Sequence, residues 1–176
     1  MIANAAQLEE LLSHIEPVER VAIDTEADSL HCYREKLCLL QVSVPGGNFI
    51  VDPLSDVDLA PLRGAFEPKE IILHGSDYDL RLLRRSMDFS PRRIFDTVIA
   101  ARLLGIREFS LAALVKRYFD IELTKGSQKA NWAKRPLPPR MLEYAINDTR
   151  FLLEMAEKLE AELKASNRHE WFLQSC

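Results

Sequence analysis

The order of strand-like and helical segments restricts the fold of this chain more than any other feature. Apolar runs with strand character occur at 21–26, 37–44, 48–52, 70–74 and 93–95. The Pro-Gly-Gly turn at 45–47 predicts that the second and third runs form a hairpin. The later runs alternate with segments of helical periodicity. We therefore expect an α/β domain in which a mixed five-stranded sheet is flanked by helices.

Capping residues and helical periodicity place the helices. Asn4 followed by Gln7 predicts a capped first helix at about 5–15. Further helices are expected at 59–66, 75–87, 97–104, 110–119 and 139–165, with a helical tail at 168–176. The segment 120–138 contains Gly and Pro and is predicted to be an exposed loop.

Length and composition indicate one domain that is not inserted in a membrane. A chain of 176 residues that is 47% hydrophobic can bury one sizeable core, so we expect 1–176 to form a single domain. No apolar run reaches the 18 residues of a membrane span, and the N-terminus lacks the basic region of a secretory signal. Cys32, Cys38 and Cys176 show no CxxC spacing and are expected to be free thiols of a cytoplasmic protein.

The charge distribution predicts one local contact with nucleic acid. The formal net charge is −4, which argues against general attraction to nucleic acid or anionic lipid. The segment 123–142, however, carries five basic residues and no acidic one. Within it, Lys129, Trp132 and Arg135 combine cations with a ring that could stack on a base. The alternative for Trp132 is that it packs on the domain.

Two acids at the end of the first strand are the first sign of a site. Asp24 and Glu26 are two residues apart, so in a strand they point to the same side at about 6.6 Å. At an effective dielectric constant near 20, two negative charges at that distance repel by roughly 2.5 kcal/mol. A proton, a basic partner or a cation would offset this repulsion. The alternative is that Glu26 lies beyond the strand end and is simply solvated.

Two aspartates after the fourth strand run are predicted to differ. Asp77 shares a helix face with Arg81 and Arg84, which indicates a solvated surface with an i,i+4 ion pair. Asp79 heads the stripe that contains Leu82 and Leu83, so it should point toward the sheet edge. We expect Asp79 to be functional and Asp77 to be a surface or capping residue.

The last long helix carries a further acid on its apolar stripe. Asp148 interrupts a stripe that includes Met141 and Leu152, and it shares a face with Tyr144 at i,i+4. Burying a carboxylate there is costly unless it has a partner. A hydrogen bond from Tyr144 or an arginine partner would satisfy it without any functional role.

Four inward-facing acids together predict a metal site. Asp24, Glu26, Asp79 and Asp148 would carry four negative charges if they cluster, and two divalent cations would balance them. Hard oxygen ligands favour Mg²⁺ or Mn²⁺ over zinc. Paired metal ions are typical of enzymes that displace one oxygen at a phosphorus atom by another. No sequence pattern of an esterase, nucleotide triphosphatase or dehydrogenase is present.

The same residues carry a resemblance to a known family. "DTE" at 24–26, "HGSDYDL" at 74–80 and "YAINDT" at 144–149 resemble the three exonuclease motifs of the DEDD superfamily. The Tyr-x-x-x-Asp form of the third motif is that of its DEDDy branch. The intervening "LCLLQVS", "FIVDPL", "IFDT", "LAALVKRYF" and "KGSQKANWAKRPL" resemble ribonuclease D catalytic domains.

The resemblance implies a ribonuclease H-like fold and metal-dependent hydrolysis of RNA from a single-stranded 3′ end to nucleoside 5′-monophosphates by a two-metal-ion mechanism. It implies that Asp24, Glu26 and Asp148 hold the first ion, that Asp24 bridges to the second, and that Asp79 contributes through water. Glu26 and the backbone near Thr25 would bind the terminal 3′-OH, and Tyr144 would orient the attacking water.

Some features of the chain depart from this family or leave alternatives. Asn131 stands where many relatives carry an Asp, and the helical nucleic-acid-binding domains of ribonuclease D would be missing after 176. His74 and Asp79 spell the His-x₄-Asp of the superfamily's His branch, but their position mid-chain argues against that role. We expect His74 to be a hydrogen-bonding residue at the site's edge that lies within reach of substrate. Exonuclease activity on DNA and a non-catalytic nucleic-acid-binding module remain alternative functions.

Overall fold

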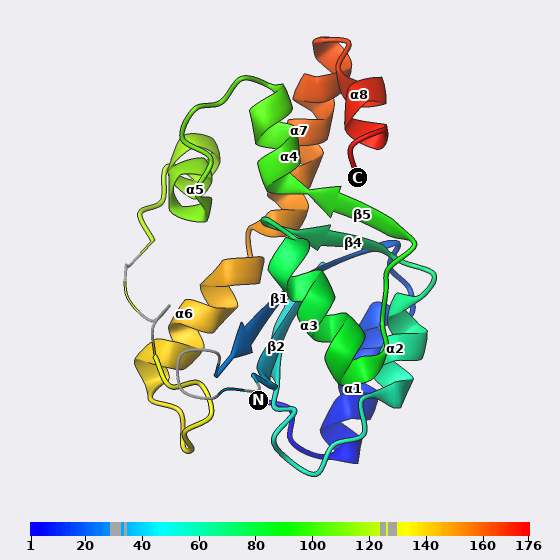
Figure 1. Ribbon diagram of the computed structural model, residues 1–176, viewed down its shortest axis with the longest axis vertical. Helices are drawn as coiled ribbons and strands as arrows, with labels where there is room; N and C mark the ends of the chain where they lie inside the picture. The colour runs from blue at the N-terminus through cyan, green and yellow to red at the C-terminus, as the bar shows by residue number, and fades with distance from the viewer. Residues whose placement is uncertain (29–32, 34, 124–125, 127–129) are drawn as a thin grey trace.

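A mixed five-stranded sheet forms the centre of the computed structural model (Figure 1), which describes residues 1–28, 33, 35–123, 126 and 130–176. The strand order is β3-β2-β1-β4-β5. Strands β1 and β2, and β2 and β3, pair antiparallel, whereas β1 and β4, and β4 and β5, pair parallel. The strands are β1 (Arg20–Ala27), β2 (Leu37–Val44), β3 (Gly47–Val51), β4 (Glu70–Leu73) and β5 (Arg93–Asp96). The predicted mixed sheet is therefore confirmed.

Helices cover both faces of this sheet (Figure 1). They are α1 (Ala5–Ile15), α2 (Ala60–Phe66), α3 (Asp77–Met87), α4 (Thr97–Leu103), α5 (Leu111–Phe119), α6 (Pro139–Thr149), α7 (Leu152–Ala165) and α8 (His169–Leu173). Alternation along β1 separates the two layers, because Val21 and Ile23 pack with α1, α2 and α3, whereas Ala22 packs with α4, α5, α7 and α8. In the described part of the chain, no helix is both long and apolar enough to cross a membrane.

The predicted cap of the first helix is present. The Asn4 side chain accepts a hydrogen bond from the Gln7 N–H at 3.0 Å, and the Gln7 side chain accepts one from the Ala3 N–H at 2.8 Å. These bonds satisfy two backbone donors at the start of α1. The cap fixes where α1 begins, so that Leu8, Leu11 and Ile15 face the core.

The single helix predicted at 139–165 is wrong, because the structure contains two helices there. Helix α6 ends at Thr149 and α7 begins at Leu152, and Figure 1 shows the two pointing in different directions. Each helix buries its apolar side in a different cluster: Ala145 of α6 packs under β2 and β3, whereas Met155 of α7 packs with β4 and β5. One straight helix could not cover both patches, so the chain bends between them.

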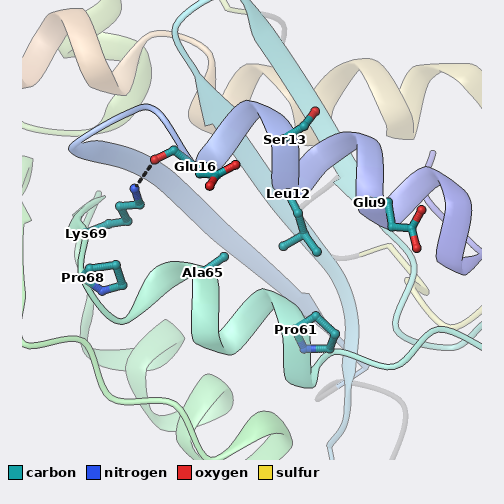
Figure 2. Close-up of a pocket in the computed structure, with 8 residues that line it drawn as sticks. All are labelled: Glu9, Leu12, Ser13, Glu16, Pro61, Ala65, Pro68 and Lys69. Carbon is teal, nitrogen blue, oxygen red and sulfur yellow. Dashed lines mark hydrogen bonds between the residues drawn. The ribbon is translucent and has the colours of Figure 1, made fainter.

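A cavity of about 570 Å³ lies between α1 and α2, away from the predicted acids (Figure 2). Leu12 and Ala65 lie between the two helices, and Glu9 and Glu16 lie along its rim. The Lys69 ammonium donates hydrogen bonds to the carbonyl oxygens of Glu16 at 2.8 Å and Val18 at 2.7 Å. Lys69 thus holds the end of α1 against the loop after α2.

Candidate active site

Strand β1 presents the first two acids on one face of the sheet. In the β1–β2 ladder, Asp24 lies opposite Gln41 and Glu26 lies opposite Leu39. Strand β4 pairs with β1 only as far as Ala22, so both acids lie beyond the parallel part of the sheet. This places them at the carboxyl-end edge where α/β folds tend to bind ligands.

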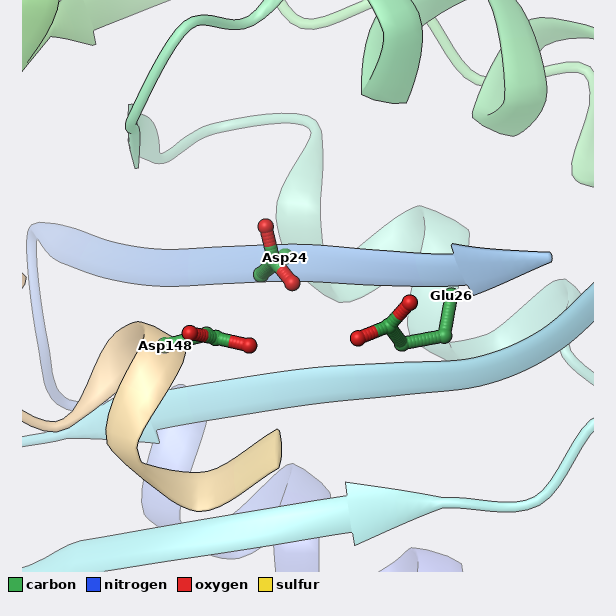
Figure 3. A group of neighbouring side chains, drawn as sticks. All are labelled: Asp24, Glu26 and Asp148. Carbon is green, nitrogen blue, oxygen red and sulfur yellow. The ribbon is translucent and has the colours of Figure 1, made fainter. Parts of the chain in front are cut away.

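Asp148 of α6 completes a cluster of three carboxylates. Figure 3 shows the side chains of Asp24, Glu26 and Asp148 converging from β1 and α6. Each can offer one oxygen such that the three oxygens lie within 4.8 Å of one another. Thr149, the next residue, has its hydroxyl 2.7 Å from that of Ser43 in β2, and this contact helps to hold the end of α6 on the sheet. The structure therefore brings together three of the four predicted ligands.

Asp79 lies beside this group and is bound to β1. Its carboxylate accepts hydrogen bonds from the Thr25 N–H at 3.1 Å and from the Thr25 hydroxyl. Asp79 is 6% exposed, whereas Asp77, two residues earlier, is exposed and forms an ion pair with Arg81 at 2.7 Å. The different environments that were predicted for these two aspartates are confirmed.

A glycine turn and Asp96 set the position of α3. Gly75 has φ +79°, a left-handed conformation that side chains rarely adopt, so the chain can turn sharply after β4. The Asp96 carboxylate accepts hydrogen bonds from the N–H groups of Gly75 at 3.1 Å and Ser76 at 2.8 Å. It also caps α4 by accepting a hydrogen bond from the Val98 N–H at 2.8 Å.

Burial and mutual repulsion raise the pKa values of the four acids. Burial raises the pKa of Asp24 well above its usual range, and the neighbouring carboxylates raise it further. Burial and the charges of Asp148 and Asp79 raise the pKa of Glu26 to about 9. Burial also raises the pKa of Asp148 to about 7 and that of Asp79 to about 6, although hydrogen bonds oppose both increases. A divalent ion would relieve the same repulsion and favour the charged forms.

The donor set fits a hard divalent cation. All of the converging ligand atoms are carboxylate oxygens, and the described residues of the group include neither histidine nor cysteine. Oxygen ligands of this kind suit Mg²⁺ or Mn²⁺. The cluster therefore indicates a site for a divalent metal ion.

Tyr144 lies beside the cluster as predicted. Its hydroxyl donates a hydrogen bond to Asp148, which lowers the pKa of that carboxyl against the effect of burial. Its ring lies 6.1 Å from the ring of Trp132, measured between centroids. Tyr144 is therefore held between a buried ring and a candidate metal ligand.

Trp132 is a packing residue. Its side chain is 1% exposed and lies in the cluster under β2 and β3. The alternative that Trp132 packs on the domain is therefore the one that the structure supports. A ring that is enclosed in this way cannot stack on a base, so the predicted substrate contact of Trp132 does not hold in this conformation.

Arg135, which was predicted to contact nucleic acid, has hydrogen-bond partners within the fold. Its guanidinium donates two hydrogen bonds to Asp52, at 2.7 and 2.6 Å, and one to the Cys38 carbonyl oxygen at 2.9 Å. The Asp52 carboxylate also accepts a hydrogen bond from the Leu54 N–H at 3.0 Å. The sequence did not predict the pairing of Asp52 with Arg135. Lys129, the third predicted contact of this segment, lies outside the described residues.

His74 lies at the edge of the site, as expected. Its Nδ1 is 2.8 Å from the Thr97 hydroxyl, and the Thr97 hydroxyl donates to the Leu73 carbonyl oxygen at 3.0 Å. Burial lowers the pKa of His74, so the imidazole favours its neutral form. The predicted hydrogen-bonding role of His74 is confirmed.

A pocket of about 340 Å³ connects these groups and includes residues that sequence reasoning missed. Its lining consists of Asp24, Thr25, Glu26, His74, Tyr78, Asp79, Ser110, Leu111, Tyr144 and Asp148. Tyr78, Ser110 and Leu111 were not among the predicted site residues. The position of Tyr78 next to Asp79 in the sequence could have indicated that Tyr78 lies at the site. The residues around Ser110 and Leu111 gave no indication that α5 begins beside the acids.

Gln41 is another polar residue that the prediction overlooked. It is fully buried opposite Asp24, and its amide nitrogen and oxygen have no hydrogen-bond partner among the described residues. A glutamine in the middle of the apolar strand "LCLLQVSV" was the signal. The structure places its amide on the face of the sheet that carries the carboxylates.

The fold and the acidic pocket together define a nuclease class. Residues 1–164 match the family model described as 3′-5′ exonuclease, and the chain belongs to this family. The match covers all three motifs that carried the predicted resemblance. The family assignment made from the motifs is thus confirmed.

Two proteins of known family are similar to this chain in sequence. The chain is 35% identical over 176 residues to ribonuclease D of Zymomonas mobilis, with 97% of the chain and 45% of the relative covered. It is 32% identical over 167 residues to the exosome complex component 10 homolog of Drosophila melanogaster, with 93% of the chain and 18% of the relative covered. The chain thus spans less than half the length of either protein.

Solved structures agree with these relatives. The catalytic core of RRP6 from Trypanosoma brucei superposes with a TM-score of 0.93 at 30% identity, covering 99% of the chain and 49% of that protein. Escherichia coli RNase D, described as an exoribonuclease involved in structured RNA processing, gives 0.93 at 28% identity, with 100% and 48% covered. The expected ribonuclease H-like fold is confirmed.

A shorter protein is also similar in structure. Brucella melitensis NrnC bound to pGG gives a TM-score of 0.81 at 26% identity, covering 89% of the chain and 79% of that protein. NrnC has also been solved with bound Mg²⁺, and that structure gives a TM-score of 0.78 at 25% identity, with 89% and 79% covered.

Proposed function

We propose that this chain is an exoribonuclease domain that hydrolyses RNA stepwise from its 3′ end and releases nucleoside 5′-monophosphates. The observation that carries the proposal is the convergence of Asp24, Glu26 and Asp148, with Asp79 and Tyr144 beside them, in one pocket of a 3′-5′ exonuclease fold. The ribonuclease D and exosome relatives support RNA as the substrate.

The metal requirement follows from the charges in the pocket. Asp24, Glu26 and Asp148 would hold one divalent cation, and Asp24 together with Asp79 would face a second. Mg²⁺ and Mn²⁺ both suit these ligands, and Mg²⁺ is bound in the NrnC structure. When bound, such ions supply positive charge that stabilises the developing negative charge on the reacting phosphate.

Residues of the chain position the substrate and the water. Glu26 and the Thr25 backbone are proposed to bind the terminal 3′-OH, because they lie at the end of β1 where Asp79 fixes the Thr25 N–H and hydroxyl. Tyr144 is proposed to orient the attacking water, because its hydroxyl already lies against Asp148. Lys129 would contact a phosphate of the incoming strand.

An assay with labelled single strands tests the proposal. Purified protein is incubated with RNA and DNA of one sequence, labelled at either end, in Mg²⁺, Mn²⁺ or EDTA. We expect RNA to shorten one nucleotide at a time from the 3′ end and EDTA to stop the reaction. Asp24→Asn should lower the rate by at least about 100-fold, because it removes a charge that faces every other acid.

A matched variant controls for nonspecific effects of removing an acid. Asp77→Asn removes an exposed carboxylate that is paired with Arg81 on the surface of α3 and should leave the rate unchanged. Internal cuts, or full activity in Asp24→Asn, would contradict the proposal. Shortening of DNA alone would favour a deoxyribonuclease, and binding without hydrolysis would favour a non-catalytic module.

Partner and location are part of the same proposal. The substrate end is proposed to be single-stranded, because the terminal phosphodiester must enter the pocket that the three acids line. A cytoplasmic location, expected from few and unpaired cysteines, stays a prediction. Cys38 and Cys176 are free thiols in the structure, and Cys32 lies outside the described residues.

A further inference from the structure

The described lining of the active-site pocket offers a nucleotide no lysine or arginine side chain. None of the described residues that line it is lysine or arginine, whereas four of them are carboxylates. A phosphate that enters meets repulsion wherever bound cations do not neutralise the acids. A contact that does not depend on charge would therefore add to the binding of the terminal nucleotide, and base stacking on an aromatic ring is such a contact.

Tyr78 is the aromatic residue at the mouth of this pocket. It lies in the first turn of α3, directly before Asp79, and lines the same pocket as Thr25 and Glu26. Its side chain is among the exposed large hydrophobic residues, with 36% of its surface accessible. An accessible ring beside the residues proposed to bind the 3′-OH is well placed to meet the base of that nucleotide.

The other described rings that line the pocket, those of His74 and Tyr144, are less accessible than the ring of Tyr78. The Tyr144 hydroxyl is bonded to Asp148 and its ring packs near Trp132, which is buried. The His74 imidazole is bonded to Thr97 and its burial lowers its pKa. Of the aromatic residues that the structure describes in this pocket, Tyr78 thus has the most accessible ring.

A hydrogen-bonded chain on the surface holds the Tyr78 ring. The Tyr78 hydroxyl donates to Glu35 Oε2 at 2.7 Å, and Arg85 donates from its guanidinium to Glu35 Oε1 at 2.9 Å. Arg85 lies about two turns further along α3, so the carboxylate of Glu35 bridges two positions of one helix. A ring whose far end is bonded in this way loses less conformational freedom when it stacks.

We propose that Tyr78 forms a subsite that stacks on the base of the 3′-terminal nucleotide, and that Glu35 and Arg85 position its ring. This inference rests on the proposed exonuclease function and adds a substrate contact to it. Stacking accepts any base, because each has a flat π-face. The subsite would therefore contribute affinity for the end of the strand without selecting its sequence.

A double-mutant cycle between protein and substrate tests the subsite. Initial rates are measured for wild type and Tyr78→Ala on single-stranded oligonucleotides that end in adenosine or in an abasic residue, as RNA and as DNA. On the adenosine end, Tyr78→Ala should raise KM by about 5- to 100-fold, the range that corresponds to one stacked base. On the abasic end, wild type and variant should have equal KM.

Two further variants separate the ring from its tether. Tyr78→Phe keeps the ring but loses the bond to Glu35, so its KM should rise only about 2- to 3-fold, and Glu35→Gln should behave alike. Trp171→Ala removes a more exposed ring from α8, which does not contribute to the described lining of the pocket, and should match wild type. Melting temperatures of all variants show whether each remains folded.

Each outcome decides between distinct conclusions. A KM increase for Tyr78→Ala that is equal on both ends would overturn the stacking subsite while leaving the exonuclease function intact. A base-dependent increase seen on DNA alone would support the subsite and reject RNA as the substrate. No 3′ shortening of either strand by wild type would reject the proposed function and, with it, the subsite.

Discussion

Asp77 and Asp79 show how strongly the environment of one residue depends on its rotation about a helix axis. Both carry the same carboxylate side chain, and both lie in the first turn of α3. Asp77 faces solvent and pairs with Arg81, whereas Asp79 turns toward β1 and accepts two hydrogen bonds from Thr25. Two residues of helix rotate a side chain by more than half a turn, which is enough to separate surface from site.

Substitution of these aspartates provides a prediction at the residue scale. Asp79→Asn removes the charge that faces Asp24 but keeps the size of the side chain, so we expect activity to fall about 10- to 100-fold. Asp77→Asn should change activity by less than about 2-fold, because the charge it removes belongs to an exposed ion pair. Steady-state rates on the RNA substrate measure both. Equal losses would mean that Asp79 acts only through its contribution to the fold.

At the scale of elements, the segment 130–138 is attached to the sheet more firmly than its composition indicated. Arg135 links this segment to Asp52, which follows β3, and to the Cys38 carbonyl oxygen of β2. Trp132 and Leu137 on either side of Arg135 are buried against the same strands. The segment therefore forms part of the core that supports α6, which carries Tyr144 and Asp148.

Loss of the Arg135–Asp52 pair should destabilise this arrangement. The Asp52 side chain is 7% exposed, so Arg135→Met would leave a buried carboxylate unpaired and lower the free energy of unfolding by about 3–5 kcal/mol. The exposed neighbour Lys134 is the control, and Lys134→Met should cost less than about 0.5 kcal/mol. Urea denaturation of both variants measures the difference.

The decrease in the free energy of unfolding caused by Arg135→Met should depend on pH, because it depends on the charge and therefore on the pKa of Asp52. Burial raises this pKa, but hydrogen bonds from Arg135 and the Leu54 N–H outweigh burial, so the pKa is lowered. A lowered pKa in the folded state means that the pair contributes fully above the pKa of an unfolded aspartate, about 3.9, and is lost as the pH falls through the folded value. The difference between wild type and Arg135→Met should therefore shrink below about pH 4. A difference that stays constant with pH would mean that packing, and not charge, causes it.

At the scale of the whole molecule, the active site lies where three elements that are far apart in the sequence meet. Strand β1 supplies Asp24 and Glu26, α3 supplies Asp79, and α6 supplies Tyr144 and Asp148. The mutual repulsion of these acids opposes the packing of the three elements. A cation that binds the assembled site would therefore stabilise the whole fold.

Metal addition provides a prediction at this scale. Divalent metal at about 100 times its dissociation constant should raise the free energy of unfolding by about 2.7 kcal/mol, because it binds only the folded state. Thermal melts with Mg²⁺ or Mn²⁺ against EDTA measure this as a rise in Tm. Asp148→Asn should reduce the rise, since it removes one of the three converging ligands, whereas Asp77→Asn should keep it. The same Tm rise in all three proteins would place the metal elsewhere.

The spacing of residues along the chain was sufficient to predict most of the helices and strands and the four acids of the site. These predictions depend on the periodicity of a strand or helix, which neighbouring residues determine. They include the strand runs, the cap at Asn4 and the different environments of Asp77 and Asp79. The failed prediction of one helix over 139–165 shows the limit of this reasoning. Its helical periodicity was real, but the bend at 150–151 depends on two separate patches of the sheet.

The sequence by itself determined the order of the elements, the family motifs and the identity of the four acids and Tyr144. Only the tertiary structure decided that Trp132 is buried, that Arg135 pairs with Asp52 and that Tyr78 lines the pocket. The physical reason is the distance along the chain between the partners. Periodicity reports which face a side chain occupies, whereas its partner on a distant segment depends on how all the faces pack together.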